Sequence, residues 1–140
     1  MATNLKNSTI HNSLRILREN LIDIRETISK KSIPLWEDLI KSLISETYER
    51  FYLAFYETNP IIKFKYIKEL YIKEKIVETE IETIRCLENN SQFPLPIYAK
   101  IISSSARIQE DTKKWLEQTK RSVLSANPDI NPEDLAIGLD

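Results

Sequence analysis

The most restrictive feature of this 140-residue chain is the spacing of its apolar side chains. Near the N-terminus they recur at alternating intervals of four and three positions, as Ile10, Leu14, Leu17, Leu21, Ile24 and Ile28. Such intervals place the side chains in one stripe along an α-helix, where they pack against neighbouring helices. A half-buried β-strand would need alternation at every second residue, and no segment shows it convincingly. The sequence therefore predicts an all-α fold.

Three further segments continue the helical pattern, and prolines mark their beginnings. After a first helix capped by Ser8 or Asn12, we expect helices over roughly 34–57, 60–87 and 97–126. Pro34 and Pro60 suit the first turn of a helix, and Asn59 is a good N-cap before Pro60. Four helices of this length with short connections predict an antiparallel up-down four-helix bundle.

The last residues differ in charge from the rest of the chain. Residues 127–140 carry four acids (Asp129, Glu133, Asp134 and Asp140) and no base, whereas the whole chain has 20 Lys and Arg against 21 Asp and Glu. Residues 1–126 therefore hold 20 basic against 17 acidic side chains. We predict a bundle over 1–126 and a short acidic tail over 127–140, which is mobile or docks on a partner. We expect the tail to bury little surface and to be dispensable for folding.

Scarcity of glycine, histidine and cysteine excludes several kinds of site. The chain has one of each, Gly138, His11 and Cys86, so a phosphate-binding loop and a Cys/His zinc site are ruled out. His11 also lacks the preceding Glu that a di-iron bundle needs. We expect His11 to be solvated and Cys86 to be a buried structural thiol. No carboxylate pair stands out as an acid/base couple, so we predict a non-enzymatic protein without metal or cofactor.

The N-terminal residues are polar and lack the apolar run of a signal peptide. No stretch approaches the ~18 apolar residues of a membrane span. A single cysteine cannot form an intramolecular disulfide, which favours a reducing compartment. The sequence predicts a cytoplasmic protein that does not contact a membrane.

Two clusters of basic and aromatic residues are candidate nucleic-acid contacts. Lysines neutralise phosphates and aromatic rings stack on exposed bases, a combination compatible with RNA or single-stranded DNA. In the third helix the lysines precede the acids, an order that the helix dipole disfavours. The alternative is a solvated face whose charge order is accidental. The predicted nucleic-acid-binding residues are Lys63, Lys65, Lys68, Lys73, Lys75, Lys113, Lys114, Lys120 and Arg121.

The second predicted helix has an apolar face that is wider than one antiparallel neighbour can cover. Aromatic residues extend this face toward the C-terminal end of the helix. They either fill the end of the bundle core or contact a second copy of the chain. On the second interpretation the protein is a homo-oligomer whose interface contains Trp36, Ile40, Ile44, Phe51, Tyr52 and Phe55.

Helix lengths, the stretch Ile67–Leu87, the short linker after it and the segment Lys113-Lys114-Trp115-Leu116 form a pattern over residues 14–122. This pattern resembles the four-helix-bundle family encoded in intervening sequences of bacterial large-subunit ribosomal RNA genes. A relative of that family is the accessory variability determinant of diversity-generating retroelements. The Trp115 segment is similar to the family's glycine-glycine-tryptophan-aliphatic close, with lysines replacing the glycines. Ser32-Ile33-Pro34 stands where members often carry Phe-Pro, and the chain lacks the strong basic charge of retroelement members.

The resemblance implies a non-enzymatic bundle that assembles into a ring-like homopentamer. It also implies that basic faces of the ring contact a reverse transcriptase and its RNA template. The alternative function is a protein–protein adaptor or scaffold. An adaptor would act through the aromatic face of the second helix or through the C-terminal tail, without nucleic acid.

Overall fold

A computed structural model describes residues 8–89, 93–131 and 135, and all regular structure within them is helical. The prediction of an all-α fold is therefore confirmed. The segments are α1 (Thr9–Asp23), the 3₁₀ turns η2 (Ile24–Glu26) and η3 (Lys30–Ser32), α2 (Ile33–Asp38), the π-helical η4 (Leu39–Leu43), α3 (Ile44–Tyr56), α4 (Pro60–Leu87) and α5 (Leu95–Ala126). Because α2, η4 and α3 follow one another without a break, the chain has four long helical rods.

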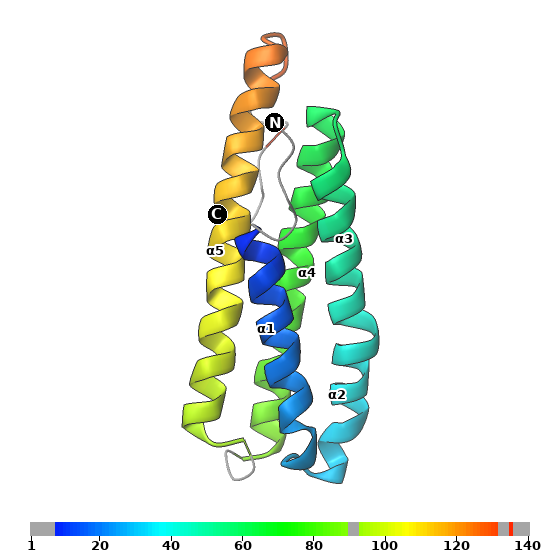
Figure 1. Cartoon of the computed structure of the whole chain (residues 1–140), viewed down its shortest axis with the longest axis vertical. Helices are drawn as coiled ribbons and strands as arrows, with labels where there is room; N and C mark the ends of the chain where they lie inside the picture. Colours follow the sequence, from blue (N-terminus) through cyan, green and yellow to red (C-terminus); the bar gives the residue numbers. More distant parts are fainter. Residues whose placement is uncertain (1–7, 90–92, 132–134, 136–140) are drawn as a thin grey trace.

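The four rods lie side by side along one long axis (Figure 1). The connections from α1 to α2 and from α4 to α5 lie at one end of the molecule, and the connection from α3 to α4 lies at the other. Consecutive rods therefore run in opposite directions. α4 packs against α3 and α5, and α1 packs against α5 and α3.

Local sequence explains where the rods begin. The Ser8 hydroxyl accepts a hydrogen bond from the backbone N–H of His11 (3.2 Å), so Ser8, one of the two predicted candidates, is the N-cap of α1. The Asn59 side chain accepts from the N–H groups of Ile61 and Ile62, and Pro60 occupies the first turn of α4. The last α-helical residue of α1 is Asp23, earlier than its apolar stripe suggests, but Ile24 and Ile28 remain buried beyond it.

The second rod contains a π-helical turn that its sequence pattern did not reveal. Leu39 and Ile44 are both buried in the core, although five α-helical residues would separate their directions by about 140°. A π-turn has more residues per turn and brings both side chains to the same side. Ile44, Thr47, Phe51 and Ala54 then follow ordinary α-helical spacing as the buried face of α3. The extra residue in η4 accounts for part of the wide apolar face of this rod.

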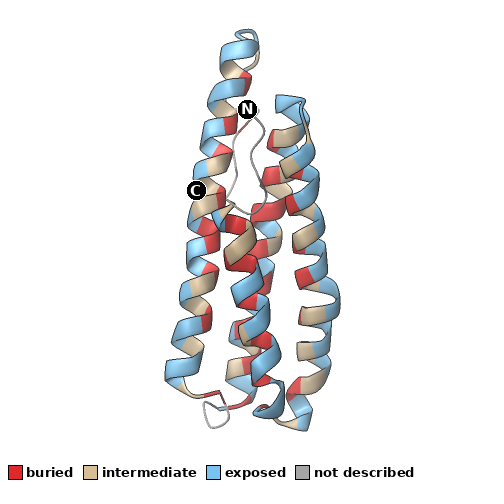
Figure 2. Ribbon diagram, in the orientation of Figure 1, coloured by how far each residue is buried: buried red, intermediate tan, exposed pale blue. Residues whose placement is uncertain are grey.

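Buried residues line the faces that the rods turn toward one another (Figure 2). All six residues of the α1 stripe are buried, as are Ile67, Leu70, Val77, Ile81 and Ile84 on α4, so these core predictions are confirmed. Ile97, which we expected on the buried side of the last helix, is 37% exposed. α1 has 15 residues whereas α4 has 28 and α5 has 32, so α1 covers only part of its neighbours. Beyond the N-terminus of α1, α3, α4 and α5 continue, and the described residues form no fourth rod there.

At the opposite end of the molecule, Glu88 joins the end of α4 to the connection between α1 and α2. Its carboxylate accepts hydrogen bonds from the Ser29 N–H (2.9 Å), the Ser29 hydroxyl (2.6 Å) and the Ser32 hydroxyl. Burial alone would raise the pKa of Glu88, but these hydrogen bonds outweigh it and hold the pKa below its usual value. Asn89 follows with a φ of 51°, a left-handed conformation that asparagine tolerates and that ends the helix.

Part of the C-terminal tail packs on this core. Asn127 ends α5, and the Ile130 N–H donates to its carbonyl group in a tight turn. Leu135 is only 7% exposed and belongs to a cluster with Ala54, Phe64, Ile67, Tyr71, Leu116 and Val123, against which Ile130 is partly buried. The expectation that the tail buries little surface is therefore wrong at Leu135, because the end beyond α1 offers apolar surface to cover. Glu133, Asp134 and Asp140 lie outside the described residues.

We predict that Leu135→Ala lowers the free energy of unfolding by roughly 2 kcal/mol, because a buried leucine loses its contacts and leaves a cavity. Urea denaturation monitored by circular dichroism measures this change. Leu95→Ala is the matched control, since Leu95 is 62% exposed and its truncation should cost less than about 0.5 kcal/mol. If Leu135→Ala lowers the free energy of unfolding as little as Leu95→Ala does, the packing of Leu135 adds nothing to stability.

Candidate nucleic-acid interface

The two predicted basic clusters meet at one end of the molecule. One cluster lies in the first half of α4 and the other in the second half of α5, and these halves are neighbours because the helices run in opposite directions. The Thr112 hydroxyl donates to Glu74 (2.7 Å), which aligns the two helices. Because the two helices run in opposite directions, residues before Glu74 on α4 lie beside residues after Thr112 on α5. Lys68 precedes Glu74 by nearly two helical turns, so along the bundle axis it lies level with residues nearly two turns after Thr112. Lys68 therefore lies at a height along the bundle between those of Lys113 and Lys120.

Several of the predicted residues are engaged in contacts within the chain. Lys73 forms an ion pair with Glu46 on α3 at 2.9 Å. The Lys75 ammonium donates to the Gln109 side chain at 3.1 Å and lies 5.0 Å from the centre of the Tyr71 ring. These lysines connect α4 to its neighbours, so part of the basic cluster on α4 has a structural role.

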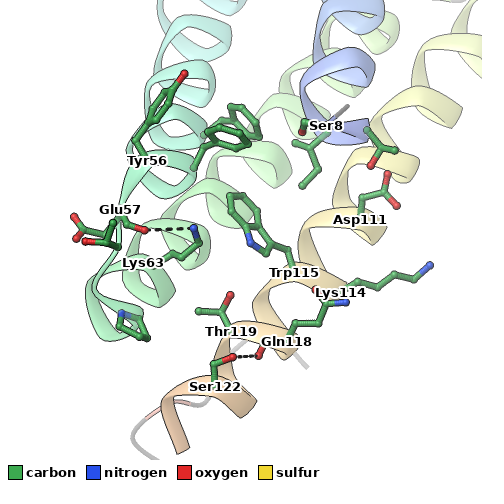
Figure 3. A pocket seen from close by; sticks show the side chains of 16 residues that line it. Ser8, Tyr56, Glu57, Lys63, Asp111, Lys114, Trp115, Gln118, Thr119 and Ser122 are labelled. Atoms are coloured by element: carbon green, nitrogen blue, oxygen red, sulfur yellow. Dashed lines mark hydrogen bonds between the residues drawn. The ribbon is translucent and has the colours of Figure 1, made fainter. Parts of the chain in front are cut away.

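Lys63 and Trp115 face each other across a pocket of about 970 Å³ beside the N-terminus of α1 (Figure 3). The Lys63 ammonium lies 5.5 Å from the Trp115 ring and donates to the Glu57 carbonyl at 3.4 Å. Burial lowers the pKa of Lys63, and the nearby Glu57 partly offsets this effect. Lys114 extends away from Trp115 and pairs with Glu110 at 3.4 Å. The pocket thus combines one half-buried cation with aromatic walls.

The remaining predicted residues lie on the outer side of the same end. Lys65 and Arg121 are exposed, and Lys68, Lys113 and Lys120 are half-buried. Neither Lys68 nor Lys113 is without an interaction partner. Lys75 and Lys114 are exposed as well, although Lys75 contacts Gln109 and Lys114 pairs with Glu110.

The aromatic face of the second rod is used mainly within the chain. Ile44 and Phe51 are 1% exposed and lie in the core, so they are not available to a second copy. The Trp36 ring N–H donates to the Leu21 carbonyl at 2.7 Å, and Ile40 and Phe55 pack against the core. Tyr52, at 37% exposure, is the predicted interface residue that remains most open.

Exposed apolar side chains continue from Tyr52 along the outer face of α3. Leu53 is 37% exposed and Tyr56 is 66% exposed. Together with Tyr48 they line an open hollow of about 620 Å³, rimmed by Glu49 and Glu57. The outer surface of α3 therefore offers an apolar surface that a partner could cover.

Two single residues differ from expectation. His11 is half-buried among the rings of Tyr48, Phe51 and Tyr52, and its Nε2 lies 3.1 Å from the Tyr52 hydroxyl. The prediction of a solvated histidine is therefore wrong, because α1 begins against the aromatic end of α3. Cys86 is exposed rather than buried, since it lies off the stripe that contains Ile81 and Ile84.

A buried carboxyl group escaped the sequence prediction. Glu74 is 3% exposed, and it occupies the position between Leu70 and Val77 in the apolar stripe of α4. That gap in the stripe is the signal that could have identified it. Thr112 donates to Glu74 Oε2, while Oε1 is buried without a hydrogen-bond partner among the described residues. Burial raises the pKa of Glu74 well above its usual value, and the Thr112 hydrogen bond offsets this only in part.

The described part of the chain contains no group of three or more His, Cys, Asp or Glu side chains arranged to hold a metal ion. Among the same residues, no helix combines the length and the apolar character needed to cross a membrane. No family model, curated protein or solved structure matches this chain.

We predict that Glu74→Gln makes the protein more stable at neutral pH. With its raised pKa, native Glu74 holds a proton that the unfolded chain releases near pH 4, so wild-type stability falls as pH rises above that value. The fall continues, at about 1.4 kcal/mol per pH unit, until the native carboxyl group ionises. Glutamine keeps a hydrogen-bonding side chain without a charge and removes this dependence.

Urea unfolding from about pH 4 to pH 8 measures the difference between the two proteins. The advantage of Glu74→Gln should grow with pH, while Glu82→Gln, an exposed position on the same helix, should show no such growth. A constant difference across the pH range would contradict a neutral Glu74.

Proposed function

We propose that this chain is a cytoplasmic, non-enzymatic accessory protein, built as an antiparallel up-down four-helix bundle, that binds RNA or single-stranded nucleic acid. The observation that supports the proposal is that the lysine-bearing halves of α4 and α5 are neighbours, with Lys68 at a height along the helices between Lys113 and Lys120. Separate parts of the sequence thus supply one row of cations over about two helical turns. Such a row neutralises several phosphates of one strand, and the released counterions favour binding.

The family resemblance extends this proposal to the partner. Accessory bundles of retroelements assemble as ring-like homopentamers that contact a reverse transcriptase and its RNA template. We propose the same role here, with the basic end of α4 and α5 facing the nucleic acid. A reverse transcriptase would then bring the template to a surface whose own affinity is modest and strongly dependent on salt.

We predict that Lys68→Glu, Lys113→Glu and Lys120→Glu together abolish binding of oligouridylate RNA at low salt, measured by fluorescence anisotropy. Wild-type affinity should fall steeply as salt is added, because phosphate contacts release counterions. The matched control is Lys30→Glu, Lys41→Glu and Lys100→Glu, which makes the same charge change at exposed positions away from the basic end. The control should keep most of the affinity.

Circular dichroism and thermal melting verify that each variant is folded. A second triple variant with glutamine at positions 68, 113 and 120 removes the charges with less repulsion. Equal loss of binding in the basic-end and control variants would mean that only net charge matters. Absence of RNA binding by the wild type at low salt would contradict the proposal and favour an adaptor.

We further propose that the protein is a homo-oligomer whose copies meet at the open hollow on α3. Tyr52, Leu53 and Tyr56 supply its apolar surface, and association would remove that surface from water. If wild-type copies do not associate, the same surface is the best candidate for the adaptor function, with a different protein as its partner.

We predict that the wild type has a mass several times the 16.4 kDa of one chain in multi-angle light scattering. Leu53→Asp combined with Tyr56→Asp should give the mass of one chain, because two charges would have to be buried on association. Leu95→Asp with Ile97→Asp, also at exposed apolar positions, should leave the wild-type mass unchanged. A wild-type mass of one chain would contradict the oligomer.

A further inference from the structure

The pocket of about 970 Å³ that contains Lys63 and Trp115 is lined by residues from all four rods (Figure 3). It lies where α1 begins, because α3, α4 and α5 extend further toward that end of the molecule than α1 does. Pockets of roughly 300–1,000 Å³ bury most of the surface of a small organic ligand. This pocket therefore has room for a molecule as large as a nucleotide.

Aromatic rings form part of the wall of the pocket. Trp115 on α5 and Phe55 on α3 are half-buried, and the Phe51 ring contacts both. The centre of the Phe51 ring lies 6.0 Å from that of Trp115 and 5.6 Å from that of Phe55. Aromatic rings stack on one another or meet edge to face, so this wall favours a ligand that is itself flat and aromatic.

Lys63 supplies a cation beside these rings. Its ammonium has three N–H donors, and its hydrogen bond to the Glu57 carbonyl is long, at 3.4 Å. Burial lowers the pKa of Lys63, which means that its contacts within the chain do not fully replace the water that it has lost. An anionic group of a ligand would replace that water with a charge-assisted hydrogen bond.

The other charged side chains of the pocket lie away from this position. Glu57 offsets the effect of burial on the Lys63 pKa only in part, and its carboxylate is directed away from Trp115 in Figure 3. Asp111 and Lys114 are drawn on the opposite side of Trp115 from Lys63. They are three residues apart on α5, so their opposite charges partly cancel. Lys63 is therefore the cation that an anion beside the aromatic wall would meet.

We propose that this pocket binds a small planar aromatic anion, with its ring against Trp115 and Phe55 and its acidic group on Lys63. Thr119 also lines the pocket, and its hydroxyl can hydrogen-bond a polar substituent of the ring. A nucleoside monophosphate and an aromatic carboxylate both have this chemistry. The inference goes beyond the proposed function, since the pocket shares none of the three lysines whose exchange tests RNA binding.

Isothermal titration calorimetry of the full-length protein with AMP and with indole-3-acetate tests the pocket. Adenosine and indole-3-acetamide keep the ring of each probe without its negative charge, and ribose 5-phosphate and acetate keep the charge without the ring. We expect at least one aromatic anion to bind with a dissociation constant below about 1 mM. Its two matched controls should bind roughly tenfold more weakly or worse, because each loses one of the two interactions.

NMR of the wild-type protein locates the bound probe. The chain has two tryptophans, each of which gives one indole N–H signal. Trp36 lies on α2 near the opposite end of the molecule and donates its N–H to the Leu21 carbonyl. The aromatic anion that binds should therefore shift the Trp115 signal and leave the Trp36 signal in place. Trp115→Leu identifies the Trp115 signal by its loss.

A pair of lysine variants tests the role of the cation. Lys63→Met removes the charge and keeps an unbranched side chain that fits a half-buried position. Lys65→Met is the matched control, because it makes the same change at an exposed position on the same helix. Affinity for the aromatic anion should fall roughly tenfold or more in Lys63→Met and less than about twofold in Lys65→Met. Circular dichroism verifies that both variants are folded.

Binding of AMP alone would identify the acidic group as a phosphate, and binding of indole-3-acetate alone would identify it as a carboxylate; either result supports the proposal. Equal affinities for an aromatic anion and its uncharged analogue would overturn it, as would equal losses in the two lysine variants. Absence of binding by both anions at about 5 mM, or an unshifted Trp115 signal at saturation, would overturn it too. None of these results depends on RNA, so this proposal and the proposed function can fail separately.

Discussion

The helical rods must each bury an apolar stripe, but they are unequal in length. α1 covers its neighbours over 15 residues, whereas α4 and α5 extend for 28 and 32. Where α1 is absent, Phe64, Tyr71 and Leu116 would meet water unless another part of the chain covered them. Leu135 and the partly buried Ile130 do so. The pocket beside Trp115 and the packing of the tail both follow from this mismatch.

Polar groups at the contacts between rods determine how the rods align. Apolar stripes alone permit helices to slide by a turn, because leucine and isoleucine contacts are similar at each step. The Thr112–Glu74 hydrogen bond inside the bundle and the Lys75–Gln109 bond at its edge are satisfied in one alignment of α4 and α5. Leaving such groups unpaired in the interior costs about 1–3 kcal/mol each, so the correct alignment is favoured over shifted ones. That alignment also places the lysines of the two helices together.

Some basic residues of α4 contact other parts of the chain and others lie at the surface, and the composition of the sequence does not distinguish the two groups. Lys73 and Lys75 hold α4 to adjacent helices, and Lys63 lies over an aromatic ring in a partly buried pocket. The basic-before-acidic order of α4, unfavourable for its dipole, places positive charge at the end of the molecule where α3 connects to α4.

Much of the fold could be predicted from local patterns. The stripe from Ile10 to Ile28, the Ser8 and Asn59 caps and Pro60 specify helices and their beginnings, because these signals act between residues a few positions apart. The π-turn, the buried Glu74, the His11–Tyr52 contact and the docking of Leu135 could not be read in this way.

The π-turn, the buried Glu74, the His11–Tyr52 contact and the docking of Leu135 each depend on contacts with residues far away in the sequence. The candidate site likewise combines features that the local sequence determines with features that depend on tertiary contacts. The sequence by itself determined which residues carry charge and which stripe of each helix is apolar, since both depend on residue type and helical period. Only the tertiary structure decided which lysines become internal links and which form a surface, because that depends on the alignment of helices far apart in the chain.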